Sequence, residues 1–378
     1  MAADYAGDVA FLKKHTDVVE LAGEGEDRLA VAPGFQGRVM TSTLAGGRGA
    51  AFGWLNEEFI ASGRQDEHFN NYGGEDRFWL GPEGGQFCLW FKKGDEFDTD
   101  CWRTPAGFGC GAFQLTGQAR SSVAMTRQFE VTNYSGTTFR CAVERTIDVI
   151  GRARAAALLG VAPAEAVRMV AFESKNALVN AGADAWRRET GLLSVWTLGQ
   201  FKPLPRGKVI VPFKPGPEAR CGPKATTDYF GEIPAERICV GDDHLLFTCD
   251  GKYRSKIGVS PARARNVLGS YDPDAKVLTI VQFTLPDDAA ERPYVNSLWE
   301  IQDEPYAGDA INSYNDGPAK PGAEALGGFY ELETSSPAAE LKPEESITHV
   351  HRTFHFAGEF DALNGLTENT LGVNLTGW

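Results

Sequence analysis

The feature that most constrains the fold is an alternation of apolar and polar residues with a period of two. Its clearest case is residues 121–150, SSVAMTRQFEVTNYSGTTFRCAVERTIDVI, where two alternating runs flank an NYSG turn. Successive side chains of a β-strand point to opposite faces, so this pattern predicts a long antiparallel hairpin. Residues 28–33 and 37–44 predict another pair. Further strands are expected at 168–174, 192–199, 208–213, 244–249, 277–285, 294–301, 328–335 and 346–357.

Helical periodicity is weak and predicts only three short helices, at 8–14, 155–160 and 359–366. No internal repeat or low-complexity linker divides the 378 residues. We therefore expect one all-β domain over residues 1–378, built as a large antiparallel β-sandwich of two packed sheets. Residues 303–327 are rich in Gly and Pro and predict a long polar loop, and loops of that length are often functional.

The net charge of −14 argues against nucleic acid as a partner, because an acidic surface repels phosphate backbones. No apolar run approaches the ~20 residues that span a membrane, and the first residues show no signal peptide. The compartment stays open, since a leader removed from a periplasmic or secreted protein would leave no trace. Seven scattered cysteines without a CxxC pair predict mostly buried thiols, with a Cys101–Cys110 disulfide as an alternative.

The segment 70–86, NNYGGEDRFWLGPEGGQ, combines five glycines with charged and aromatic residues. A phosphate-binding loop would need a following helix and a nearby lysine, whereas here FCLWF predicts a strand. One interpretation is an internal ion-pair network that holds the loop. The other is a sugar site, because carboxylates and guanidinium groups bind hydroxyls and an aromatic ring stacks on a sugar ring. The residues concerned are Glu75, Asp76, Arg77, Trp79 and Glu83.

The carboxy-terminal stretch 327–356 predicts two strands with ionisable faces. Alternate residues share a face, so Glu331 and Glu333 lie together, as do His349, His351 and His355. Pairing Glu333 with His349 would place Glu331 opposite His351. Such a patch could act as acid and base near neutral pH, could hold a divalent metal through His349 and His351, or could simply satisfy its own hydrogen bonds.

The two ends of the chain resemble the galactose mutarotase superfamily, which includes the aldose 1-epimerases. Residues 29–56 are similar to that family's first strands, and Leu332, Glu333 and Thr334, followed by Pro337, Leu341, Pro343, Glu345 and Ser346, are similar to its last strand pair. Glu344 stands where the family usually has glycine. The loop at 70–86 resembles an uncharacterised bacterial branch of the same superfamily. The resemblance implies a β-supersandwich with a concave carbohydrate site, and it implies that Glu333 is the general base.

One departure from the epimerases concerns the general acid. Their central histidine segment corresponds to ESKNALVNAG, residues 173–182, which contains no histidine. His351, His349 or Lys175 would have to supply the proton, or the protein does not epimerise. The superfamily also contains lyases, glycosidases and sugar-binding proteins without activity, so the fold does not decide the reaction.

We therefore expect a carbohydrate ligand in a concave groove and no cofactor. Glu333 would be the base, and His351 or His349 the acid. Two alternatives stay open: a non-catalytic carbohydrate-binding protein, and a metal-dependent polysaccharide lyase or glycoside hydrolase. The residues expected to bind substrate are Glu75, Arg77, Trp79, Glu83, Asn180, Trp196, Asn315, Asp316 and Glu331, with Lys320 as a further contact from the long loop.

Overall fold

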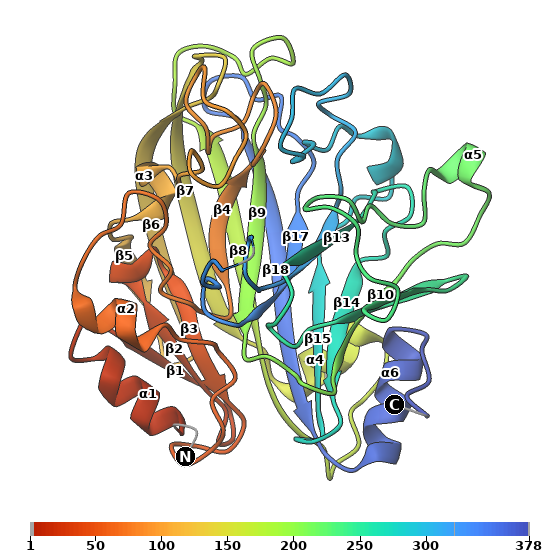
Figure 1. The fold of residues 1–378 in the computed structure, drawn as a ribbon. Helices are drawn as coiled ribbons and strands as arrows, with labels where there is room; N and C mark the ends of the chain where they lie inside the picture. Colours follow the sequence, from red (N-terminus) through yellow and green to blue (C-terminus); the bar gives the residue numbers. More distant parts are fainter. Residues whose placement is uncertain (1–3, 321, 377–378) are drawn as a thin grey trace.

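The computed structural model describes residues 4–320 and 322–376, and within them the strands form three antiparallel sheets (Figure 1). The largest runs in the order β11 (Ile238–Val240), β12 (His244–Thr248), β10 (Lys208–Pro212), β14 (Val267–Asp272), β15 (Val277–Phe283), β18 (Ser346–Ala357), β8 (Arg168–Asn180), β7 (Thr138–Val149), β6 (Ser122–Thr132) and β5 (Gln114–Gln118). The second runs β13 (Ser255–Val259), β16 (Ile311–Asn315), β17 (Tyr330–Ser335), β9 (Ser194–Phe201) and β4 (Arg77–Gly81). The third is β1 (Val19–Ala22), β2 (Arg28–Ala32) and β3 (Arg38–Thr43).

Short helices lie outside the sheets, as Figure 1 shows for α1 beside the three-stranded sheet and for α6 at the carboxy-terminal end. In the part of the chain that the structure describes, no helix combines the length and the apolar character needed to cross a membrane. The helices are α1 (Tyr5–Leu12), α2 (Glu57–Ser62), α3 (Ala106–Gly109), α4 (Arg152–Leu159), α5 (Glu218–Cys221) and α6 (Phe360–Thr370), with 3-10 turns at Pro33–Phe35 and Ala289–Glu291.

The five-stranded sheet packs face to face on the ten-stranded sheet. Leu332 of β17 lies in the same apolar cluster as Phe283 of β15, and the Tyr330 hydroxyl lies 2.8 Å from the hydroxyl of Ser270 in β14. Residues 330, 332 and 334 of β17 therefore face the larger sheet. Because a strand alternates, Glu331 and Glu333 face the opposite way.

A buried ion pair joins the three sheets where they meet. The Arg145 guanidinium, on β7, pairs with the Asp76 carboxylate at the entrance to β4, and both side chains are fully buried. Arg145 also donates to the carbonyl of Gly37, which precedes β3, at 2.9 Å. The Ser174 hydroxyl of β8 donates to Asp76 at 2.7 Å. This network fixes the position of β4, from which the site residues Arg77 and Trp79 project.

The all-β antiparallel sandwich expected from the sequence is confirmed, and most of the predicted strands are present. The hairpin at 121–150 is β6 paired with β7, and the pair near 28–44 is β2 with β3. The three expected helices correspond to α1, α4 and α6. Glu344, at the family's glycine position, has a φ of 67°, a left-handed conformation that glycine adopts without steric cost.

Four structural expectations were wrong. The stretch FCLWF is not a strand, because the strand of that region is β4, which lies before it at 77–81. Residues 294–301 form no strand, and the long loop at 303–327 contains β16. The last two strands do not pair with each other: β17 pairs with β16 and β9, whereas β18 pairs with β15 and β8.

Cysteine usage also differs from the expectation. Cys101 and Cys110 are free thiols, so they form no disulfide with each other. Only Cys88, Cys141 and Cys249 are buried, and Cys239 is exposed.

Replacing Arg145 with methionine is expected to lower the free energy of unfolding by about 3–5 kcal/mol, because Asp76 would remain as an unpaired buried charge. Urea denaturation measures the loss. Arg140→Met on the same strand is the control, since its ion pair with Glu130 is largely exposed and should contribute less than about 1 kcal/mol. Equal losses in the two variants would contradict the structural role of the buried pair.

Candidate functional site

One face of the five-stranded sheet forms the floor of a cavity of about 300 Å³. Its register places the floor residues side by side: Trp79 lies opposite Trp196, Tyr314 lies opposite Glu331, and Lys256 lies opposite Tyr314. Arg77 and Leu198 are also paired across β4 and β9. Directly opposed residues of antiparallel strands share a face, so all five strands contribute to one surface.

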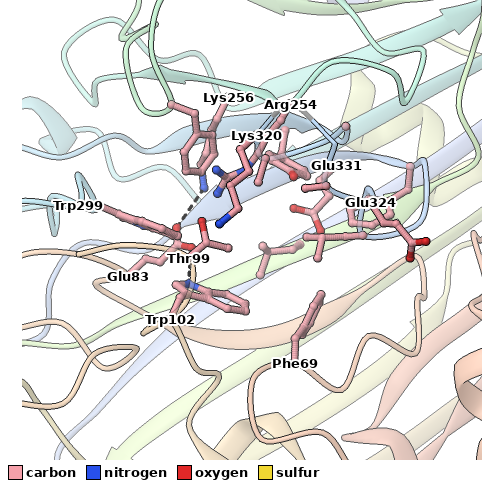
Figure 2. Close-up of a pocket in the computed structure, with 18 of the residues that line it drawn as sticks. Phe69, Glu83, Thr99, Trp102, Arg254, Lys256, Trp299, Lys320, Glu324 and Glu331 are labelled. Carbon is pink, nitrogen blue, oxygen red and sulfur yellow. Dashed lines mark hydrogen bonds and ion pairs between the residues drawn. The ribbon is translucent and has the colours of Figure 1, made fainter. Parts of the chain in front are cut away.

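Loops that follow or precede these strands build the walls. Figure 2 shows Trp102 and Phe69 across the cavity from Lys256 and Arg254, with Trp299 at one side. The loop after β16 contributes further lining residues, and the Asp316 carboxylate closes its base by accepting from the N–H groups of Gly327 and Gly328, each at 2.8 Å. The wall residues are Phe69, Thr99, Asp100, Trp102, Phe230, Arg254, Trp299, Gly317, Ala319, Lys320, Ala323, Glu324, Leu326 and Phe329.

Arg77 is the central cation of the floor. Its Nη2 donates to Glu331 Oε1 at 2.7 Å, and its guanidinium stacks 3.9 Å from the centre of the Trp79 ring. Only 1% of Arg77 is exposed, yet among the described residues its Nε and Nη1 have no hydrogen-bond partner. These two buried nitrogen atoms are therefore unsatisfied within the described residues, and an unsatisfied buried donor costs free energy.

Lys256 organises a second charged group. Its Nζ lies 3.1 Å from Glu333 and 3.7 Å from Glu83, and 4.6 Å from the centre of the Trp196 ring. Trp196 Nε1 donates to Glu333 at 2.9 Å, and Trp102 Nε1 donates to Glu83 at 3.0 Å. Glu83 lines the cavity, whereas Glu333 is fully buried and reaches it only through Trp196 and Lys256.

Burial shifts the acid–base behaviour of these groups. It raises the pKa of Glu331 to about 8, against the lowering effect of Arg77 and with the help of the neighbouring Glu333. Burial likewise raises the pKa of Glu83, although Lys256 opposes the shift. Burial alone would lower the pKa of Lys256, but Glu333, Glu83 and Glu331 together raise it. Within the cavity, burial thus favours the protonated form of Glu331, and the surrounding carboxyl groups favour the charged form of Lys256.

The histidines expected to face Glu331 and Glu333 lie elsewhere, so that prediction was wrong. His349 and His351 project from β18 into the space between the sheets, where both share the Thr334 hydroxyl at 2.8 and 2.9 Å. Thr334 is on the opposite face of β17 from both glutamates. Burial lowers the pKa of His349 to about 3 and that of His351 to about 4. Neither imidazole lines the cavity, and the facing Glu–His pattern behind the metal hypothesis is absent.

Five of the residues expected to bind substrate line the cavity: Arg77, Trp79, Glu83, Trp196 and Glu331. Lys320 also lines it, on the loop side.

Four others do not line it. Glu75 accepts from Ser42 and pairs with His355 at 2.9 Å, because the chain at residue 75 hydrogen-bonds to β3 rather than β9. Asn180 ends β8 and donates to the carbonyls of Asp184 and Leu341. The Asn315 side chain accepts from the N–H of Gly251 and donates to the carbonyl of Tyr253. Asp316 accepts from the N–H of Gly327 at the base of the loop after β16.

Sequence reasoning missed Lys256 and Arg254 and gave Trp102 only a packing or supporting role. The signal for the two cations was present, because YRSKIGV alternates and places residues 254 and 256 on one face of a strand. The turn residues CDGKY obscured that strand. Phe69, Phe230 and Trp299 lie on loops, where no periodicity points to the cavity.

Comparison with known proteins concerns both sequence and fold. Residues 3–377 match the model of one protein family, described as a family of unknown function (DUF6786). No curated protein matches the chain. The structure is similar to a putative aldose 1-epimerase from Escherichia coli K12, with a TM-score of 0.52 and 12% identity, covering 90% of this chain and 98% of the other. It is also similar to the Slr1438 protein from Synechocystis sp. PCC 6803, with a TM-score of 0.51 and 10% identity. That match covers 91% of this chain and 96% of the other.

These likenesses, at 10–12% identity, concern the fold. They confirm the galactose mutarotase-like sandwich expected from the two ends of the chain.

Glu331→Gln is expected to change how stability depends on pH. The raised pKa means that the folded chain binds this proton more tightly than an unfolded glutamate, whose pKa is about 4.3. Proton binding by Glu331 therefore stabilises the folded state. This stabilisation is complete below the unfolded pKa of about 4.3 and is lost as the pH rises toward about 8. The free energy of unfolding of the variant minus that of the wild type should therefore increase between those limits in urea titrations.

Glu340→Gln is the matched control, because that carboxylate is half exposed in its pair with Arg188. A difference for Glu331→Gln that stays constant with pH would show that Glu331 titrates as an ordinary glutamate.

Proposed function

We propose that this chain, which belongs to the family of unknown function DUF6786, binds a carbohydrate in the cavity above the five-stranded sheet. The observation that carries the proposal is the unpartnered Nε and Nη1 of buried Arg77, beside the carboxyl group of Glu331. Sugar hydroxyls both donate and accept, so they suit a floor that presents guanidinium donors next to carboxyl oxygens.

The aromatic walls support the same ligand class. Trp102, Phe69 and Trp299 line the cavity while remaining only partly buried, so their rings can meet a ligand. Amphipathic rings suit a molecule with apolar C–H faces and a polar edge. The volume of about 300 Å³ is at the lower end of the range typical of small-molecule sites, which favours one or two sugar units.

Acid–base chemistry at the anomeric centre is a second candidate function. The observation that favours it is the pKa of Glu331, raised to about 8, in a cavity that also holds Glu83. Two carboxyl groups in different environments are the usual basis of paired acid and base roles. In this version Glu331 donates the proton and Glu83 accepts one, while Glu333 holds Lys256 in position. The cavity-lining residues that the structure describes include no histidine, so an imidazole acid has no support.

Binding is tested by titrating the protein with D-glucose, D-galactose and their uronic acids, followed by saturation-transfer NMR and calorimetry. Trp102→Ala is expected to weaken binding about threefold to tenfold, because contacts to the face of an aromatic ring contribute on the order of 0.5–1.5 kcal/mol. Trp186→Ala is the control, since Trp186 lies outside this cavity against Phe139. Equal binding by the Trp102 variant and the wild type would reject the proposed site.

The second candidate function is tested by exchange NMR of anomers. Wild-type protein should accelerate anomer interconversion of a bound sugar, and Glu331→Gln should slow it by at least about 100-fold, the lower limit for loss of a general acid. Binding without any acceleration by the wild type would leave a sugar-binding protein that is not an epimerase.

A further inference from the structure

We propose that the cavity selects a sugar derivative bearing an oxyanion, a carboxylate or a phosphate, and that Arg254 recognises it. This inference rests on the proposed function and specifies its ligand class. It follows from the charges that remain after the ion pairs of the cavity are assigned.

Four cations line the cavity, and three of them lie beside a carboxyl group. Arg77 donates to Glu331, Lys256 pairs with Glu333 and Glu83, and Lys320 lies 4.0 Å from Asp100, with both side chains largely exposed. Arg254 is the remaining cation, and within residues 4–320 and 322–376 it forms no ion pair. A half-buried guanidinium without a counter-ion is a receptor for an anionic group.

Aromatic contacts hold Arg254 in place for this role. Its guanidinium carbon lies 3.7 Å from the centre of the Phe230 ring and 5.5 Å from the centre of the Trp299 ring. Stacking on ring faces orients the planar group and leaves its edge donors available for a bidentate acceptor. Figure 2 shows Arg254 on the same side of the cavity as Lys256 and Lys320.

The nearby carboxyl groups have closer partners than Arg254. Burial raises the pKa of Glu83, and the charges of Lys256 and Arg254 oppose that shift. Glu83 is held by Lys256 and by the Trp102 indole, and Glu331 is held by Arg77. Glu324 is exposed on the loop after β16. The unpartnered donors of Arg77 at the floor would meet hydroxyls, while Arg254 on the wall would meet the oxyanion. One ligand with a hydroxylated ring and a charged substituent therefore satisfies both guanidinium groups.

The test uses calorimetry at low salt with matched pairs of probes: D-galacturonate against D-galactose, D-glucuronate against D-glucose, and D-glucose 6-phosphate as the phosphate arm. At least one anionic probe should bind tenfold or more tightly than its neutral parent, and added salt should weaken it. Arg254→Gln should remove roughly tenfold or more of that affinity, as expected for loss of a charge-assisted hydrogen bond, and leave the neutral parent within twofold.

Arg64→Gln is the matched control, because Arg64 also lies over a phenylalanine ring, that of Phe59, but is exposed and outside the cavity. Preference for a uronate assigns the carboxylate, and preference for glucose 6-phosphate assigns the phosphate. Neutral sugars that bind as tightly as the acids, or an equal loss of both in Arg254→Gln, would overturn the inference and leave the proposed function intact. If no sugar, charged or neutral, binds to the protein, both this inference and the proposed function are overturned.

Discussion

The ion pair between Asp76 and Arg145 is the interaction on which the arrangement of the site depends. It sits where β4, β7 and the start of β3 converge, and Ser174, Asn176 and Gly37 provide its further hydrogen bonds. The residue that follows Asp76 is Arg77, on the cavity floor. Because adjacent strand residues point in opposite directions, fixing the aspartate on one side aims the guanidinium on the other.

The same arrangement, with a buried polar residue on one face of a strand and a residue directed toward the cavity on the other, recurs on β17. Thr334 faces the larger sheet and shares its hydroxyl with His349 and His351, while Glu333 on the other side holds Lys256 and Trp196. The polar layer between the sheets and the cavity floor are therefore two faces of one sheet. The interior layer positions the floor, which gives a structural role to His349 and His351, neither of which lines the cavity.

The alternation of residues 121–150 predicted β6 and β7, and the resemblance of residues 29–56 and of the stretch around Leu332–Thr334 to one superfamily predicted the fold. Neither sequence feature was sufficient to predict which strands pair with β17. Strands that follow each other in sequence were expected to form a hairpin, but these two belong to different sheets. The sequence shows which residues share a face of a strand, and it does not show which sheet the strand joins.

The residues of the cavity were likewise predicted only in part. Arg77 and Trp79 were named because the Gly-rich segment 70–86 combines charged and aromatic residues, and Glu331 was named because alternation places it on one face of a strand with Glu333. Glu75 was misplaced because it was grouped with the other charged residues of segment 70–86, whereas its backbone N–H bonds to Val39 of β3 and its carboxylate to Ser42 and His355. Trp299 and Phe230 come from loops whose path depends on tertiary contacts.

The base of the loop after β16 has a consequence for how such a protein can diversify. Asp316 binds Gly327 and Gly328, and its backbone N–H donates to the carbonyl of Phe329, so the loop is closed at its stem. Insertions or deletions beyond that stem would leave the register of β16 and β17 unchanged. Relatives could therefore acquire new ligand preferences by exchanging this segment alone, with the sheet beneath it serving as a constant platform.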